Sequence, residues 1–156
     1  MAGHLLLIFL ISMLPVVELR GAIPYAAIFS IDVWLAAIVA VLGNIVPVPL
    51  VIWGMDKLIE LFGRTKGIGP ILTRFVARAE EKAKKAGDIG MLGLLVFVGI
   101  PLPGTGAWTG AMISSILKLP PKKAIPAIFA GLIMSATIMC VISYLLPDLF
   151  KALFMH

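Results

Sequence analysis

The chain has 156 residues, of which 61% are apolar and 13% are charged. Soluble domains contain about 45–50% apolar and about 25% charged residues, and a short chain cannot bury so much apolar surface in a soluble core. This composition excludes a soluble enzyme, a disordered chain and a disulfide scaffold. It predicts an all-α protein that crosses the cell membrane several times.

The net charge of +5 comes mainly from two stretches. Eight of the thirteen Lys and Arg residues lie between Lys57 and Lys85, and Lys118, Lys122 and Lys123 form a second group. Positive residues of membrane proteins concentrate in cytoplasmic loops. We therefore expect both stretches to face the cytoplasm, and we expect no nucleic-acid partner.

Residues 5–17, LLLIFLISMLPVV, are similar to the apolar core of a signal peptide. No Lys or Arg precedes them and no small-residue cleavage site comes before Glu18, so we interpret them as part of the mature protein. We expect a re-entrant helical hairpin over residues 4–30, broken near Pro15, that enters from the outer side. A single tilted crossing by residues 4–30 is the alternative.

Residues 33–55 form the clearest membrane span. The stretch from Trp34 to Trp53 covers about 28 Å at ~1.5 Å per residue, close to the ~30 Å of a hydrocarbon core. Tryptophan is typical of both membrane interfaces. The span ends at a cytoplasmic basic loop, residues 57–88. Within this loop we expect an amphipathic helix over residues 70–86 on the inner membrane surface, or alternatively a solvated linker helix.

Residues 89–117 are uncharged but are interrupted by PLPG. A single crossing would place Lys118 and the lysines after it outside, against the positive-inside rule. Proline and glycine near the middle break a helix, and each arm alone is too short to span. We therefore expect a second re-entrant hairpin over 89–117 that enters from the cytoplasm, followed by a span over 124–147.

The two halves of the chain show an internal similarity. Residues 21–31, GAIPYAAIFSI, resemble residues 106–116, GAWTGAMISSI, and each is followed by a long uncharged run. We predict a single membrane domain, 1–156, with two inverted repeats over 1–56 and 89–147. Opposed broken helices that meet near the membrane midplane form the substrate site of many transporters.

Glu18 and Arg20 are charged residues at the first hairpin tip. A charged side chain at membrane depth has a high free-energy cost, so a functional role is the default interpretation of these two residues. The carboxylate could exchange a proton or hold a cation, whereas the pair could equally be structural and close the hairpin. Asn44 interrupts the best span together with Pro47 and Pro49, and it is predicted to hydrogen-bond a neighbouring helix. The carbonyl groups freed by the two prolines could face the same cavity.

The tip of the second hairpin, residues 101–110, is the most unusual stretch of the chain. The arm that follows it would present a positive helix end to an anion. The alternative is close helix packing through the Gly106-x-x-x-Gly110 pattern. Together with Glu18, Arg20 and Asn44, the candidate substrate- or proton-binding residues at this tip are Pro101, Pro103, Gly104, Thr105, Gly106, Trp108 and Thr109.

With these motifs, the chain resembles the small multidrug export protein family of prokaryotic membrane proteins. The most specific match is PLPGTGAWTG at residues 101–110, supported by ELRGAIP at residues 18–24. That family is in turn similar in outline to the DedA membrane proteins, whose paired re-entrant hairpins are implicated in lipid-carrier translocation. The resemblance implies transport.

We expect a transporter or flippase with a midplane site for an amphipathic or lipid-phosphate substrate. The alternatives are a proton-coupled small multidrug exporter and a non-transport membrane scaffold. The sequence shows no catalytic triad, metal-ligand cluster or nucleotide-binding loop, so we expect no enzyme activity, cofactor or metal. The expected partners are membrane lipids, and a homodimer or larger homo-oligomer is expected because two full spans and four short arms make a thin bundle.

Overall fold

The structure, a computed structural model, describes residues 2–63, 77, 88–102 and 104–146. Regular structure within these ranges is entirely helical, which confirms the all-α class. Val33–Met55 and Pro121–Leu145 are long and apolar enough to cross a membrane. They coincide closely with the two predicted spans.

The first part of the chain is a pair of short antiparallel helices. α1 covers Ala2–Met13 and α2 covers Glu18–Ile28, with a turn over residues 14–17 between them. Pro15 favours this turn because proline has no N–H to donate and therefore tends to end a helix. α3 then begins after Asp32, whose side chain accepts a hydrogen bond from the Leu35 N–H at 3.0 Å.

The predicted span 33–55 consists of two helices. α3 covers Val33–Ile45 and α4 covers Pro47–Gly63, with the break at Val46. Pro47 and Pro49 lack the N–H groups that would continue the helical hydrogen bonds across this point. Residues 57–63 continue α4 instead of beginning the predicted loop. The rest of that loop and the predicted helix over 70–86 lie outside the described residues, except for residue 77.

The second part of the chain contains another pair of short helices and one long helix. α6 covers Asp88–Gly99 and α7 covers Ala107–Ile116. α8 covers Pro121–Cys140 and continues into a π-helical turn, η1, over Val141–Leu145. Pro121 suits the first turn of α8, where its missing N–H costs nothing.

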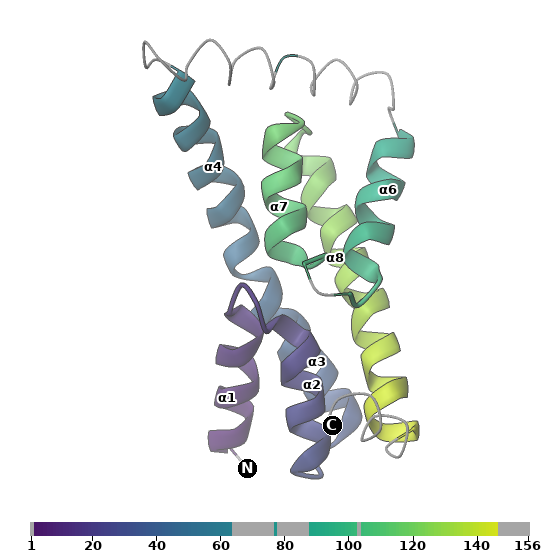
Figure 1. The fold of residues 1–156 in the computed structure, drawn as a ribbon. Coiled ribbons are helices and arrows are strands. Elements are labelled where there is room, and N and C mark those ends of the chain that lie inside the picture. The colour runs from purple at the N-terminus through teal and green to yellow at the C-terminus, as the bar shows by residue number, and fades with distance from the viewer. Residues whose placement is uncertain (1, 64–76, 78–87, 103, 147–156) are drawn as a thin grey trace.

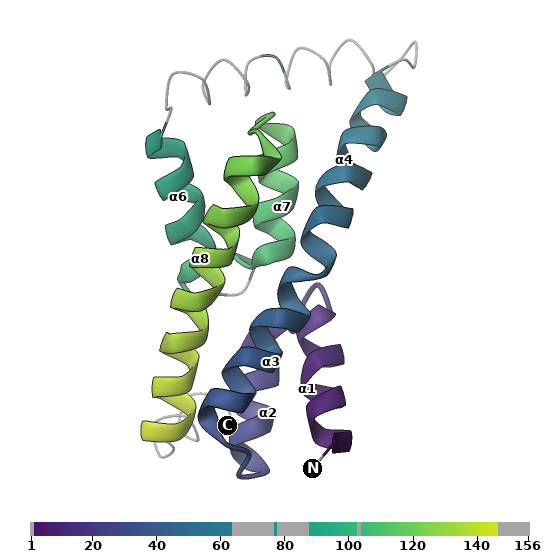
Figure 2. The same ribbon diagram turned by 180° about the vertical axis from the view of Figure 1, so that it is seen from behind.

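The two short helix pairs lie at opposite ends of the molecule and point their turns toward each other (Figure 1). α1 and α2 occupy one half, α6 and α7 occupy the other half, and α8 runs along both (Figure 2). α1 and α2 pack against α3, whereas α7 packs against α4 and α6 packs against α8. The two turns therefore meet near the middle of the bundle.

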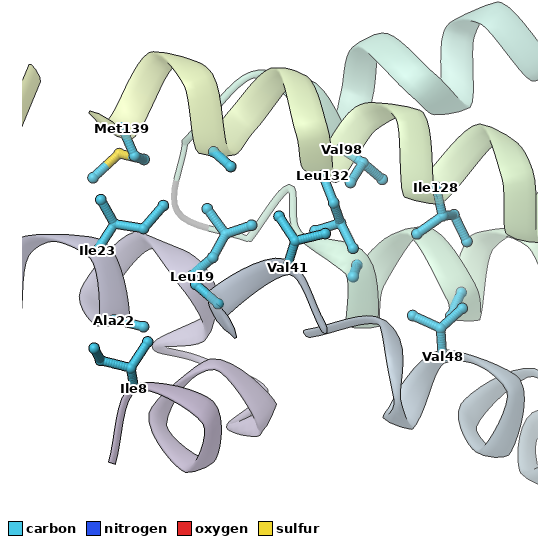
Figure 3. Packing of buried hydrophobic residues seen from close by; sticks show 14 of the residues in the cluster. Ile8, Leu19, Ala22, Ile23, Val41, Val48, Val98, Ile128, Leu132 and Met139 are labelled. Carbon is cyan, nitrogen blue, oxygen red and sulfur yellow. The ribbon is translucent and has the colours of Figure 1, made fainter. Parts of the chain in front are cut away.

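Small and medium-sized apolar residues form a core between the two halves. Leu19 and Ile23 of α2 and Val41 of α3 face Leu132 and Met139 of α8 (Figure 3). This core fixes α2 against α8, and α2 begins with the charged residues of the first tip. Packing of the apolar side chains thus positions those charges.

α6 and α8 approach closely because Gly131 has no side chain. A methyl group at Gly131 would lie 2.6 Å from the Leu95 carbonyl oxygen and 2.8 Å from Cβ of Val98. Real contacts of this kind are essentially always longer, so α6 and α8 would have to move apart.

Gly131→Ala is therefore expected to destabilise the protein by about 1–3 kcal/mol, the usual cost of overpacking. The measurement is the free energy of unfolding in mixed micelles with increasing denaturing detergent. Gly93→Ala on α6 is the matched control, because nothing lies within 4 Å of its added methyl group. This control should be neutral or stabilising by about 0.5–1 kcal/mol, and equal effects of the two substitutions would contradict the packing argument.

Candidate functional site

Glu18 lies at the first residue of α2 and is almost completely buried, with 2% of its surface exposed. Its φ of 51° is in the left-handed region, which is uncommon for a residue other than glycine. Residues two apart on a regular helix do not face each other. At this irregular start of α2, however, Oε2 of Glu18 accepts a hydrogen bond from Nη1 of Arg20 at 2.7 Å.

Arg20 joins the first tip to the second. Its Nη2 donates to Oγ1 of Thr105 at 3.1 Å and approaches the Ile100 carbonyl oxygen at 3.4 Å. The Thr105 hydroxyl lies 2.7 Å from that same carbonyl oxygen, to which it donates. The guanidinium thus holds a carboxylate on its own hairpin and two oxygen acceptors on the other hairpin.

The N-terminus of α7 contacts the Glu18 carboxylate. Oε1 of Glu18 accepts a hydrogen bond from the backbone N–H of Trp108 at 3.3 Å. Gly106 lies directly against the carboxylate, and a methyl group there would overlap with it. The positive end of the helix dipole favours an anion at this place. The helix N-terminus that was predicted to receive a substrate anion is therefore occupied by the protein's own carboxylate.

A further contact between the tips is made by the Trp108 side chain. Its indole Nε1–H donates to the Met13 carbonyl oxygen at 3.1 Å, at the C-terminal end of α1. The backbone acceptors at Met13 and Ile100 were not among the predicted site residues. The prolines that follow each of them, Pro15 and Pro101, are the only sequence signal for free carbonyl groups near a helix end.

Asn44 is fully buried on α3, and its side-chain amide lies near the Glu18 carboxylate, toward which it acts as a weak hydrogen-bond donor. Neither Oδ1 nor Nδ2 of its amide has a hydrogen-bond partner among the described residues. The predicted hydrogen bond to a neighbouring helix is therefore present only as this weak contact with Glu18 of α2. Buried polar groups are nearly always paired, so this amide calls for an explanation.

The remaining predicted residues have different positions. Gly104 is exposed, and its φ of 83° allows the turn of the second tip. Pro101 and Thr109 are half-buried near this tip, and Pro103 lies outside the described residues. The two glycines of the Gly106-x-x-x-Gly110 pattern have separate contacts, since a methyl group at Gly110 would lie 2.6 Å from Cγ2 of Val98 on α6.

Together, Glu18, Arg20, Thr105 and Trp108 form a polar junction between the two hairpin tips, which we call the tip junction. One carboxylate and one guanidinium compensate each other's charge within it. Within the described residues, no cluster of three or more His, Cys, Asp or Glu side chains could hold a metal ion. The chemistry available at the tip junction is therefore ion pairing, hydrogen bonding and proton exchange.

Gly106→Ala is expected to destabilise the protein by about 1–3 kcal/mol because its methyl group would push the Glu18 carboxylate away from α7. Backbone strain is not the cause, since Gly106 has an ordinary φ of −81°. A double-mutant cycle with Glu18→Ala measures this coupling through the free energy of unfolding. The same glycine substitution should cost little once Glu18 is alanine, and an undiminished cost would place the clash elsewhere.

Comparison with protein-family models gives one finding that bears on this geometry. The model described as "Putative small multi-drug export protein" matches residues 18–138, which is more than half of the chain and includes Glu18, Arg20, the second tip and most of α8. No curated protein and no solved structure matches the chain, so these comparisons do not show the similarity to DedA proteins. The chain belongs to the putative small multi-drug export protein family.

Proposed function

We propose that this protein is a membrane transporter whose substrate site lies at the tip junction. The observation that carries the proposal is the pair of buried Glu18 and half-buried Arg20, which is shared between two hairpins that approach from opposite ends of the bundle. The family description supports a membrane export protein and hence a transporter in general. We propose the protein's substrate class and mechanism from the geometry of the tip junction.

In the proposed arrangement, the α1–α2 and α6–α7 pairs are re-entrant hairpins of two inverted repeats, as the sequence predicts. Their opposed directions and the position of both turns near the middle of α8 support this arrangement (Figure 1). None of the four helices is long enough to span a membrane. Irregular backbone at membrane depth is tolerated where it is buried in protein or lines a wet cavity.

Transport would proceed by separation of the two tips, which exposes the site to one side of the membrane at a time. We favour an amphipathic or lipid-phosphate substrate, because Arg20 offers a positive charge and α7 offers a helix N-terminus. Membrane lipid would cover the exposed apolar faces, and a homodimer or larger oligomer stays a prediction.

A proton-coupled exporter of cationic drugs is the second candidate, and the buried carboxylate of Glu18 favours it. A cation would, however, have to displace Arg20, which lies 2.7 Å from that carboxylate. In the third candidate, a scaffold without transport, the tip junction would only hold the hairpins together. Substitutions that preserve the fold but change transport distinguish these candidates.

The orientation in the membrane is the first test of this proposal. The C-terminal half of α4, which includes Lys57, and the start of α8, which includes Lys122, lie toward the same end of the bundle, whereas the α2–α3 turn with Ser30 lies at the other end (Figure 1). In a chain with Cys140→Ser, cysteines at positions 57 and 122 should be labelled only from the cytoplasmic side. A cysteine at position 30 should be labelled only from outside. Labelling of positions 57 and 122 from opposite sides would contradict the second hairpin.

Transport in proteoliposomes is the second test, with a fluorescent phosphatidylglycerol as the anionic probe and ethidium as the cationic probe. Arg20→Ala should slow the anionic probe about 10- to 100-fold, the loss expected for hydrogen bonds to a charged group. Glu18→Gln should remove the pH dependence of transport, because the amide keeps the shape of the side chain but does not titrate.

Lys122→Ala is the matched control for Arg20→Ala, since it also removes one positive charge but lies far from the tip junction. It should transport the anionic probe at the normal rate. Faster movement of ethidium than of the lipid would favour the drug exporter. Unchanged transport and pH dependence in both variants would leave the tip junction with only a structural role.

A further inference from the structure

The side-chain amide of Asn44 is buried and polar, and it therefore needs hydrogen-bond partners. Its amide offers an acceptor at Oδ1 and a donor at Nδ2, and both are buried without a partner among the described residues. Arg20 Nε, in the same junction, is also a buried donor to which the described part of the chain offers no partner. These groups require a ligand, or a second position of a neighbouring side chain, that can both donate and accept.

The neighbouring side chain is Glu18, and its two protonation states have different hydrogen-bonding capacities. An ionised carboxylate can only accept, whereas a protonated carboxyl group both donates and accepts. The ionised form therefore matches the donors around it in this structure, which are Arg20 Nη1, the Trp108 N–H and, more weakly, Nδ2 of Asn44. It leaves Oδ1 of Asn44 without a donor. The protonated form matches the Asn44 amide, because its O–H can donate to Oδ1 while its C=O accepts from Nδ2.

We propose that Asn44 receives the carboxyl group of Glu18 when that group is protonated, and that an oxyanionic head group then binds the donors that Glu18 has left. Those donors are Arg20, including Nε, and the N-terminus of α7. This inference rests on the proposed transport function and specifies its substrate class and coupling. One proton from solution binds to Glu18 for each oxyanion that binds, and no other bond forms or breaks.

Among the described side chains, one charged group lies close enough to Glu18 to take part in this exchange. Of the described side chains, Arg20 is the charged group that acts on the Glu18 carboxylate. The other titratable or charged groups on helices packed against α2 are at the helix ends: His4 on α1, Asp32 before α3, and Lys122, Lys123 and Cys140 on α8. Tyr144 of η1 donates to the Ile31 carbonyl oxygen instead.

Two sources could supply the oxyanion, namely a lipid head group and a free inorganic anion. The probes are dioctanoyl phosphatidylglycerol and inorganic sulfate, which carry fixed charge near neutral pH, so that any proton taken up binds to the protein. Binding is measured on the whole chain in uncharged maltoside micelles. Proton uptake is followed with a pH-sensitive dye in weak buffer.

For the wild-type chain, the affinity for the bound probe should rise about tenfold for each pH unit lowered, over the range in which free Glu18 is ionised. About one proton should be taken up per bound anion. Glu18→Gln should bind the probe without pH dependence and without proton uptake. Tight binding of the phosphatidylglycerol alone assigns a lipid substrate, and tight binding of sulfate as well assigns a site that recognises the anion itself.

Asn44→Leu is the decisive variant, because leucine fills a similar volume without the amide. It should weaken binding at low pH about tenfold or more, the effect of losing one or two hydrogen bonds to the protonated carboxyl group. Infrared spectra give a second measurement. The C=O stretch of protonated Glu18, identified by its absence in Glu18→Gln, should move to higher frequency in Asn44→Leu as its hydrogen bonds are lost.

Ser135→Ala is the matched control, since Ser135 on α8 is also buried and its hydroxyl group has no hydrogen-bond partner in the ranges that the structure describes. It should leave binding, proton uptake and the infrared band unchanged. An Asn44→Leu variant that behaves like this control would overturn the role of Asn44, even if Arg20→Ala still abolishes transport. Binding that is independent of pH in the wild-type chain would overturn the exchange, while normal flux would leave the proposed transport function standing.

Discussion

A carboxylate that is buried away from water needs a compensating charge and hydrogen-bond donors, because burial of an unpaired charge has a very high free-energy cost. Glu18 meets this requirement with groups from two different hairpins. Arg20 belongs to the same hairpin as the carboxylate, and the Trp108 N–H belongs to the other. The ionised carboxylate consequently holds the two tips together. The apolar core between α2 and α8 serves this contact by fixing the position from which Glu18 reaches α7 (Figure 3).

Several features of the site could be predicted from sequence because they depend on local chemistry. The uncharged runs predict long apolar helices, and the Pro- and Gly-rich stretch around residues 101–104 predicts a break between two short ones. The high cost of charge at membrane depth suggested that Glu18 and Arg20 would find a partner near the second tip. The contact between Arg20 and Thr105 satisfies that expectation. The roles of these residues in transport remain proposals.

Other features could not be predicted because they depend on how distant segments pack. Direct pairing of Glu18 with Arg20 requires the left-handed backbone of Glu18, which nothing in its residue type favours. The α7 N-terminus has the same general affinity for a substrate anion and for a protein carboxylate, so sequence alone could not assign its occupant. The unpartnered state of Asn44 depends on the positions of neighbours far away in the chain.

The break at Val46 has a mechanical consequence for the whole molecule. It divides one long span into α3, which packs against α1 and α2, and α4, which packs against α7. A few residues at such an interruption can absorb a change in direction while the flanking helices stay rigid. The first hairpin therefore packs against one segment of this span, and α7 of the second hairpin packs against the other segment. A change in the angle at this interruption would therefore alter the orientation of one hairpin relative to the other.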